Sequence, residues 1–514
     1  MELSGPDMSG LLCLLWLCLS LNQSTAALAL PYNFNSTELM KCSYGERGSL
    51  TATCVNANAS YFKMTPYRFD QLDETLVCSS CNLKTLESGT FDISGNQIKN
   101  LQLSYSKIEL LKQKAFVGLI FLKNLNMSHN SITSVYPGTF TGVKKIESID
   151  LSYNNITVLS DDGFLELINL KELNLAYNSI KTISSKAFNG LGNLVLLNLE
   201  RNNITEVSDV LSKLINLQVL NLRDNQILKL QGSEFTNLLS LLLLDLSFNK
   251  LDTPVIEFYP NNSLKSLYIT NNYIRSPSLG FLNGLHNLET LDLSYNTIVE
   301  IQKATLLGLY HLRFLNISYN RITTFQTGVF TGLPYLELLN MSHNAISYGE
   351  ITGVFSLHSL FALDLSHNKI PRLDYEALIS RLPRLSYLRL EGNPLPCDLE
   401  EEMNTYFEAD NFKFVLHDPY NNTKSCVLEP TKHSEKVIKE TVPELDENRS
   451  AGMSGGEVAA VILLCLAYLC LGLLFYVQYR TFRESRNQGP HRATSSVNLI
   501  SAEDGRPGDE YLRE

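Results

Sequence analysis

One motif recurs along most of this 514-residue chain and constrains its fold more than any other feature. Aligned on L-x-x-L-x-L-x-x-N, the sequence places the Asn-type residue at fourteen positions, which lie 23 to 25 residues apart. These positions are Cys81, Ser106, Asn130, Asn154, Asn178, Asn202, Asn225, Asn249, Asn272, Asn296, Asn320, Asn344, Asn368 and Asn393. One unit of this length cannot bury its own leucines, whereas stacked units bury them in one continuous core. The period therefore predicts an α/β solenoid with a parallel sheet.

The residue pattern within a unit predicts which side chains face the core. In LETLDLSYN, Leu291 and Leu293 alternate along a short strand and point inward, while Asp292 and Ser294 face outward. The Asn side chain can bond the backbone of the turn that ends the strand. In many units an aromatic residue follows ten positions after the Asn position, which predicts a stacked spine beneath the convex side. These residues are Phe91, Phe116, Phe140, Phe164, Phe188, Phe235 and Phe330.

Units such as AFNGLGNLVLLNLERNNI resemble the typical leucine-rich repeats of animal cell-surface proteins. The resemblance covers roughly residues 70 to 426 and includes Toll ectodomains and insect adhesion proteins of the connectin and chaoptin kind. It implies a leucine-rich repeat horseshoe with a concave parallel sheet and a cap at each end. It implies little about the ligand, because one fold serves many functions.

The two ends of the chain predict a secreted ectodomain with a single membrane anchor. An unbroken apolar run at residues 11–19 is typical of a secretory signal, although no Lys or Arg precedes it. Residues 458–477 form a stretch of twenty residues without a charge, which as a helix matches a hydrocarbon core of about 30 Å. Because Arg480, Arg483 and Arg486 follow this stretch, we expect a cytosolic C-terminus and an extracellular ectodomain.

These boundaries divide the chain into seven segments. They are a signal peptide at 1–27, an N-terminal cap at 28–80, leucine-rich repeats at 81–396, a C-terminal cap at 397–428, a stalk at 429–457, a transmembrane helix at 458–477 and a cytoplasmic tail at 478–514. The tail is too short for a Toll-type signalling domain or a kinase. Tyr511, within DEYLRE, is either a phosphorylation site or, as we favour, an unmodified residue of an acidic tail.

Six cysteines lie in the predicted ectodomain, an even number that permits three disulfides in an oxidising compartment. The resemblance places Cys397, in NPLPC, and Cys426 in a C-terminal flanking cap and predicts a disulfide between them. The cap departs from the usual pattern, because the second cysteine expected just after Cys397 is absent. Cys42, Cys54, Cys78 and Cys81 are placed for an N-terminal cap, and their pairing stays open. A buried free thiol at Cys81 is the alternative, since this residue occupies an Asn position of the repeat.

The sequence contains no constellation typical of an enzyme. It lacks the motifs HExxH and GxxxxGK[ST], so we expect neither catalysis nor a cofactor. The net charge of −11 forms no acidic or basic block in the ectodomain, so nothing indicates a nucleic-acid partner. His129, His343 and His367 share one repeat position at the edge of the concave sheet. We favour solvated side chains copied by repeat duplication over a metal site at these histidines.

Sequons for N-linked glycans are abundant, and a glycan blocks the surface beneath it. They include Asn35, Asn58, Asn126, Asn155, Asn203, Asn261, Asn316, Asn340, Asn421 and Asn448. Asn126, Asn316 and Asn340 fall on an outward strand position, so glycans there would cover the concave sheet near both of its ends. The equivalent residues of the middle units are not sequons, which leaves the middle of the sheet open.

In these middle units the outward residues depart most from the LSYN norm, and we predict a protein-binding patch there. Its residues are Glu172, Leu196, Glu200, Arg201, Val219, Arg223, Asp224, Leu243, Phe248 and Tyr268. Apolar side chains with aromatic residues and a charged rim are typical of protein interfaces. The alternative is neutral drift on an unused face, with some of the apolar residues packed on their neighbours.

Together these features predict a single-pass type I protein of the plasma membrane that acts as an adhesion molecule or co-receptor. Its ectodomain is built for wide contact, while its tail offers no enzyme. The expected partner is an extracellular or cell-surface protein, or a second copy of the chain. The alternative is a ligand-sensing immune or developmental receptor that signals through an associated partner.

Overall fold

The computed structural model describes the part of the chain that contains the repeats and the core of both caps. It covers residues 41–416, with gaps at 45–47, 64–71, 93–94, 208, 254, 257, 278–281, 283, 303–304, 327, 348–356 and 409–412. The predicted signal peptide, stalk, transmembrane helix and cytoplasmic tail lie outside these residues. Within the described residues, no helix is both long and apolar enough to cross a membrane.

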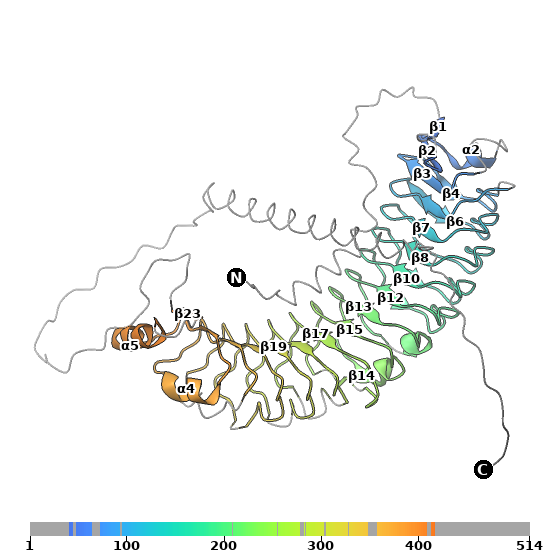
Figure 1. The fold of residues 1–514 in the computed structure, drawn as a ribbon. Helices are drawn as coiled ribbons and strands as arrows, with labels where there is room; N and C mark the ends of the chain where they lie inside the picture. Colours follow the sequence, from blue (N-terminus) through green and yellow to red (C-terminus); the bar gives the residue numbers. More distant parts are fainter. Residues whose placement is uncertain are drawn as a thin grey trace, which may run out of the picture. The chain divides into compact units, whose positions relative to one another are not determined.

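One main sheet of seventeen strands runs through the repeats and both caps. Its strands are β1 (Lys41–Tyr44), β2 (Thr51–Val55), β3 (Thr75–Ser79), β5 (Asn100–Gln102), β7 (Asn124–Asn126), β8 (Ser148–Asp150), β10 (Glu172–Asn174), β12 (Leu196–Asn198), β13 (Val219–Asn221), β15 (Leu243–Asp245), β17 (Ser266–Tyr268), β18 (Thr290–Asp292), β19 (Phe314–Asn316), β20 (Leu338–Asn340), β21 (Ala362–Asp364), β22 (Tyr387–Arg389) and β23 (Lys413–Val415). From β2 onward each strand pairs in parallel with the next, whereas β1 runs antiparallel to β2. The strands lie side by side along the inner side of the curved stack, which confirms the predicted parallel solenoid (Figure 1).

The described parts of the return segments, on the other side of the stack, form short regular elements. Three two-stranded parallel sheets join β4 (Lys84–Leu86) to β6 (Ile108–Leu111), β9 (Val158–Leu159) to β11 (Thr182–Ile183), and β14 (Gln231–Gly232) to β16 (Val255–Ile256). The described residues also form helices α2 (Ala59–Lys63) and α4 (Tyr375–Arg381), and 3-10 turns η1 (Asp209–Lys213) and η2 (Ser233–Phe235). Helix α5 (Cys397–Glu408) follows the repeats in the C-terminal cap. Helix α4 begins after Asp374, whose side chain accepts a hydrogen bond from the Ala377 backbone N at 2.9 Å.

The core follows the predicted pattern of inward leucines and stacked aromatic rings. Leu291 and Leu293 are fully buried, as are their equivalents along the stack. All seven predicted spine phenylalanines are buried, which confirms the spine. From Phe91 through Phe116 and Phe140 to Phe164, successive ring centroids lie 6.4, 5.6 and 5.9 Å apart in stacked geometry. Stacking lets each repeat bury its apolar residues only against its neighbours, so the rod has one continuous core.

The Asn positions bond not only their own turn, as predicted, but also the preceding repeat. The Asn249 Nδ2 donates to the carbonyls of Leu246 and Ser247 at 3.0 and 3.2 Å, and to the carbonyl of Leu222, one repeat earlier, at 2.9 Å. Its Oδ1 accepts from the Ile227 backbone N at 3.0 Å. We call the recurring set of these residues the Asn ladder; it satisfies buried backbone groups that have no strand partner.

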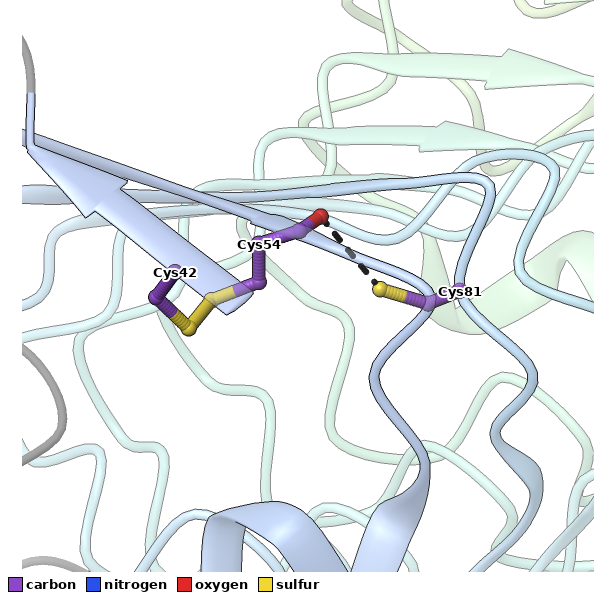
Figure 2. Close-up of a disulfide and its surroundings, with 3 residues drawn as sticks. All are labelled: Cys42, Cys54 and Cys81. Carbon is purple, nitrogen blue, oxygen red and sulfur yellow. Dashed lines mark hydrogen bonds between the residues drawn. A yellow bond between two sulfur atoms is a disulfide. The ribbon is translucent and has the colours of Figure 1, made fainter. Parts of the chain in front are cut away.

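The N-terminal end of the sheet is closed by the antiparallel pair β1 and β2. Cys42 and Cys54 lie directly opposite each other in this pair and form a disulfide (Figure 2). Cys78 and Cys81 are free and buried, so the alternative of a free thiol at Cys81 is confirmed. The three disulfides that the cysteine count permits are therefore not all formed.

The position of Cys81 in the Asn ladder explains why it stays unpaired. Its thiol contacts the Cys54 carbonyl oxygen at 3.6 Å, which is the link to the preceding unit that Asn makes in later repeats (Figure 2). The hydrogen bond with Cys81, followed by burial, raises the pKa of the Cys78 thiol well above its usual range. Since the thiolate is the reactive form, the raised pKa makes Cys78 a structural and unreactive thiol.

The C-terminal end is closed by β23, which adds to β22, and by α5. The rings of Tyr375 on α4 and Phe407 on α5 lie 5.9 Å apart, and Phe407 is buried. Cys397, at the start of α5, is disulfide-bonded. Its partner lies outside the described residues, so the pairing with Cys426 stays a prediction.

Candidate functional site

The unbroken register of the sheet arranges the outward residues of the repeats in columns. We name the columns by the repeat of β12: Leu196 stands in the first column, Asn198 in the second, Glu200 in the third and Arg201 in the edge column. Leu196 pairs with Val219, and Asn198 with the equivalent residue of β13. Neighbouring strands in a sheet lie about 4.8 Å apart, so side chains of one column contact each other directly.

The edge column contains two stacks of rings separated by a gap. The N-terminal ring ladder consists of Tyr105, His129, Tyr153 and Tyr177, with centroids 4.4, 4.2 and 4.2 Å apart. The C-terminal ring ladder consists of Tyr295, Tyr319, His343 and His367, with centroids 4.1, 4.0 and 4.1 Å apart. Every residue of both ladders has a positive φ near 50°, and this shared backbone conformation aligns the rings.

Four residues without a ring stack, Arg201, Asp224, Phe248 and Asn271, fill the gap between the ladders. Arg201 lies over the last ring of the N-terminal ladder, 5.0 Å from the Tyr177 centroid, and its Nε pairs with the Asp224 carboxylate at 2.8 Å. The Arg223 guanidinium lies 4.2 Å from the Phe248 ring centroid. The structure therefore brings together the predicted residues Arg201, Arg223, Asp224 and Phe248 through charge and cation–π contacts.

The first column changes character in the same repeats. Next to it, Lys171 pairs with Glu147 at 2.7 Å, and Lys265 pairs with Glu289 at 2.8 Å. Between these ion pairs the equivalent positions hold apolar or uncharged residues, Val195, Gln218 and Leu242. The middle of the sheet thus presents an apolar strip bordered on both sides by ion pairs.

Within this strip the predicted first-column residues differ in exposure. Leu196 and Val219 are half-buried, and Glu172 at the border is exposed and accepts from the Ser148 hydroxyl at 3.2 Å. Leu243 is only 6% exposed, so it offers little surface to a partner. Leu243 therefore belongs to the packing of the sheet, which was the alternative for some of the apolar residues.

Carboxylates in the second and third columns are held in a partly desolvated setting. Burial raises the pKa of Glu200, while the Arg223 charge lowers it, and the Asn221 Nδ2 donates to Glu200 at 3.2 Å. Burial likewise raises the pKa of Asp245. Tyr268, also half-buried, stands in the second column beside Asp245. The site thus offers an apolar strip with hydrogen-bonding groups on one flank, which suits docking of a protein surface.

Sequence reasoning missed a second apolar run in the first column near the C-terminal end. Phe314, Leu338, Ala362 and Tyr387 occupy successive strands there and are half-buried. Phe361, just before the column, is 54% exposed. The signal was present in the sequence as aromatic and aliphatic residues where earlier repeats have Asn or Ser.

The described sequons differ widely in access. Asn155, Asn203 and Asn261 are exposed, Asn58, Asn316 and Asn340 are half-buried, and Asn126 is only 8% exposed. Asn35, Asn421 and Asn448 lie outside the described residues. A glycan needs an exposed side chain, so the structure separates sequons that the motif alone treats alike.

The three histidines of the edge column are more than solvated copies, because each lies within a ring ladder. Burial lowers the pKa of His129 and of His343, and the neighbouring His367 lowers the pKa of His343 further. No group of three or more His, Cys, Asp or Glu side chains among the described residues is placed to hold a metal ion.

The repeat, the concave sheet and its columns define a leucine-rich repeat protein. The leucine-rich repeat profile matches residues 96–156, 144–204, 215–274, 262–322 and 286–346. Among curated proteins, none matches this sequence. Leucine-rich repeats are a general scaffold for protein interaction, and the profile indicates no enzyme family.

Three solved structures share the fold. A leucine-rich repeat protein of Leptospira interrogans is 25% identical with a TM-score of 0.55, and the match covers 67% of this chain and 90% of that one. The APL1 leucine-rich repeat domain is 20% identical with a TM-score of 0.53, covering 69% and 90%. Toll, in its Drosophila complex with Spätzle, is 22% identical with a TM-score of 0.53, covering 64% of this chain and 48% of Toll.

Proposed function

We propose that this protein is a cell-surface adhesion molecule or co-receptor that binds a protein partner through the middle of its concave sheet. Support comes from the fold, which is a scaffold for protein interaction, and from the predicted signal and membrane anchor. Toll, with the same fold, was solved in complex with Spätzle, so this fold can bind a ligand.

One observation carries the proposal: the repeats stay regular inside while their surface changes abruptly between β12 and β17. Ion pairs next to the first column give way to an apolar strip there, and the ring ladders are interrupted at the same repeats. Core packing does not require this change, because the same core leucines continue through it. In these repeats the outward residues differ from those of the other repeats and are apolar, aromatic or charged. Such a composition is expected of a protein-binding patch.

The proposal is tested by placing a charge in the strip and in a matched position outside it. Val219→Glu lies in the first column of β13, and Ala362→Glu lies in the first column of β21; both residues are half-buried. The secreted ectodomain, residues 28–457, is applied in labelled multimeric form to a panel of animal cells. We expect Val219→Glu to reduce cell binding at least about tenfold, because a buried unpaired charge at an interface costs several kcal/mol.

Ala362→Glu should retain binding, which separates a local effect from general damage to the sheet. Circular dichroism and Tm of the two variants establish that both are folded. Equal binding by both variants and the wild type would remove the middle strip as the contact surface.

Cell aggregation distinguishes the adhesion proposal from the receptor alternative. Suspension cells that express the full chain should cluster with each other if the protein is a homophilic adhesion molecule. If they stay dispersed, while a soluble ligand produces a response that depends on residues 478–514, the protein is a receptor that signals through a partner.

A further inference from the structure

We propose that N-linked glycans at Asn316 and Asn340 pack on the apolar run of the first column and close the C-terminal half of the concave sheet, while Asn126 stays unmodified. The inference rests on the proposed extracellular placement of the ectodomain. It deepens the proposed function, because it says which parts of the sheet a protein partner can reach.

The strand geometry places an apolar side chain next to each of these two sequons. Residues two apart on a strand point to the same face, so Phe314 stands beside Asn316 and Leu338 beside Asn340. The register brings Phe314 next to Leu338 and Asn316 next to Asn340 on the neighbouring strand. Two sequons thus adjoin one shared apolar platform.

The amide of Asn316 is already oriented for a glycan. Its Oδ1 accepts from the Ser318 backbone N at 3.1 Å and from the Ser318 hydroxyl at 2.8 Å, which directs the oxygen toward the turn. Its Nδ2 donates one hydrogen to the Asp292 carboxylate at 3.1 Å. A glycosylated Nδ2 keeps one hydrogen, so this bond can persist while the other hydrogen is replaced by the sugar.

The platform itself is held in place. The Arg313 guanidinium lies 5.6 Å from the Phe314 ring centroid and forms a two-pronged ion pair with Glu337, with contacts of 2.9 and 2.8 Å. The first N-acetylglucosamine of a glycan has an apolar face of C–H groups and an acetyl methyl. Packing that face on half-buried Phe314 and Leu338 removes apolar surface from water, which stabilises both.

Asn126 occupies the same strand position but lacks both access and platform. Its Oδ1 accepts the same backbone hydrogen bond, from the Ser128 N at 2.9 Å, but the residue is only 8% exposed. Two residues before it stands Asn124, whose side chain donates to Asn100 at 2.7 Å. A polar neighbour already engaged in a hydrogen bond gives a sugar no apolar surface, and the low exposure of the Asn126 side chain leaves little room for it.

The modification is the usual transfer from a lipid-linked oligosaccharide pyrophosphate. The Asn Nδ2 forms a bond to C1 of the first sugar, the bond from C1 to the pyrophosphate oxygen breaks, and the lipid pyrophosphate leaves. One Nδ2 proton is released. No oxidation or reduction occurs.

The test is site-by-site occupancy of the full chain expressed in animal cells. Glycopeptidase treatment converts each occupied Asn to Asp, and mass spectrometry then compares the sequons. We expect occupancy at Asn316 and Asn340 at least about fivefold above that at Asn126. Equal occupancy at the three sites, or an order in which Asn126 leads, overturns the inference.

The exposed sequons Asn155, Asn203 and Asn261 separate this inference from the proposed cell-surface placement. If they are modified while Asn316 and Asn340 are not, the platform is wrong and the extracellular placement stands. If no sequon is modified, the placement fails and the inference fails with it.

A second measurement tests the packing of the sugar directly. Asn316→Gln removes the glycan and should lower Tm. The decrease in Tm should be at least about twice as large in the wild type as in a Phe314→Ala background. Asn203→Gln, which removes a glycan from an exposed position outside the sheet, serves as the matched control. Equal Tm shifts with and without Phe314 would contradict the platform.

Discussion

The two ring ladders and the gap between them occupy one column of one fold, yet their side chains behave differently. In the ladders each ring stacks on the ring of the next repeat, so the surface repeats as faithfully as the core. In the gap, Arg201 ends one stack and pairs with Asp224, and Phe248 pairs with Arg223 instead of a neighbouring ring. The backbone of the column is the same in both regions, because the ladder residues and the gap residues Arg201, Asp224, Phe248 and Asn271 share a positive φ near 50°.

The comparison shows that the repeat constrains the interior and leaves the outward columns free to vary. Neighbour stacking fixes the core leucines along the whole stack, the phenylalanine spine in many units, and the Asn ladder from Asn130 onward. A ring in the edge column is one solution among several, since charged residues occupy the same backbone conformation. The middle repeats thus changed their surface without a change in fold, which is what a binding site on a scaffold requires.

The largest predicted effect tests whether the Asn ladder contributes equally to stability in the middle repeats and in the repeats of a ring ladder. Asn249→Ala, next to Phe248 of the gap, and Asn320→Ala, next to Tyr319 of the C-terminal ring ladder, each remove the same set of backbone hydrogen bonds. Because buried carbonyl and N–H groups are left unpaired, we expect each to lower the free energy of unfolding by about 3 kcal/mol or more. Denaturant unfolding measures the loss.

The two losses should agree within about 1 kcal/mol. A much smaller loss for Asn249→Ala would show that the interior also differs in the middle repeats. The conclusion that the core is constant while only the surface varies would then be wrong.

The next predicted effect compares the stability contributed by a side chain of the C-terminal ring ladder with that contributed by a side chain of the gap. Tyr319 and Phe248 are both 40% exposed, but Tyr319 stacks between two rings and Phe248 does not. We expect Tyr319→Ala to cost about 1–2 kcal/mol of stability, given two aromatic contacts. Phe248→Ala should cost less than about 1 kcal/mol, because it loses one exposed cation–π contact.

Binding should show the reverse order. Phe248→Ala should weaken cell binding of the ectodomain severalfold, and Tyr319→Ala should leave it unchanged. If Tyr319→Ala abolishes binding of a folded protein, the C-terminal ring ladder and not the gap is the contact surface.

The smallest predicted effect is a pH dependence of stability that comes from His343 in the C-terminal ring ladder. Burial lowers the pKa of His343 below its usual value of 6.5, so the unfolded chain binds the proton more readily than the folded chain. This contribution to stability is present above about pH 6.5 and is lost as the pH falls through the lowered pKa. The wild type should therefore lose more stability between pH 7 and about pH 5 than His343→Asn does.

The comparison with His343→Asn is needed because other groups titrate nearby. Burial raises the pKa of Asp150, Asp245 and Asp292, which acts in the opposite sense, since the folded chain then binds protons more readily. These carboxylates are common to both proteins, so the difference isolates His343. An identical pH profile for the variant and the wild type would show that the stacked imidazole does not sense acid.

Much of the interior could be predicted from the sequence, because periodicity alone places it. A leucine that recurs at a fixed offset from the Asn position must face the core in every unit, and Phe140 or Phe235 follows from the same counting. The concave position of the middle residues follows as well, since strand alternation assigns their direction.

What side chains do across neighbouring repeats could not be predicted in the same way. The burial of Leu243 depends on the width of side chains on the adjacent strands, which lie 23 or 24 residues away in the sequence. The pairing of Cys42 with Cys54 depends on an antiparallel strand at the end of the sheet, which the repeat does not contain. Stacking of His129 between two tyrosines requires a shared left-handed backbone, which spacing does not reveal.

The central claim is that a protein partner contacts the apolar strip and the gap in the ring ladders. Hydrogen–deuterium exchange of the ectodomain, with and without its bound partner, tests this most directly. We predict protection of the segment from Glu172 to Tyr268, with little change from Phe314 to Asp364. Protection confined to the latter segment, or to the convex return segments, would contradict the claim.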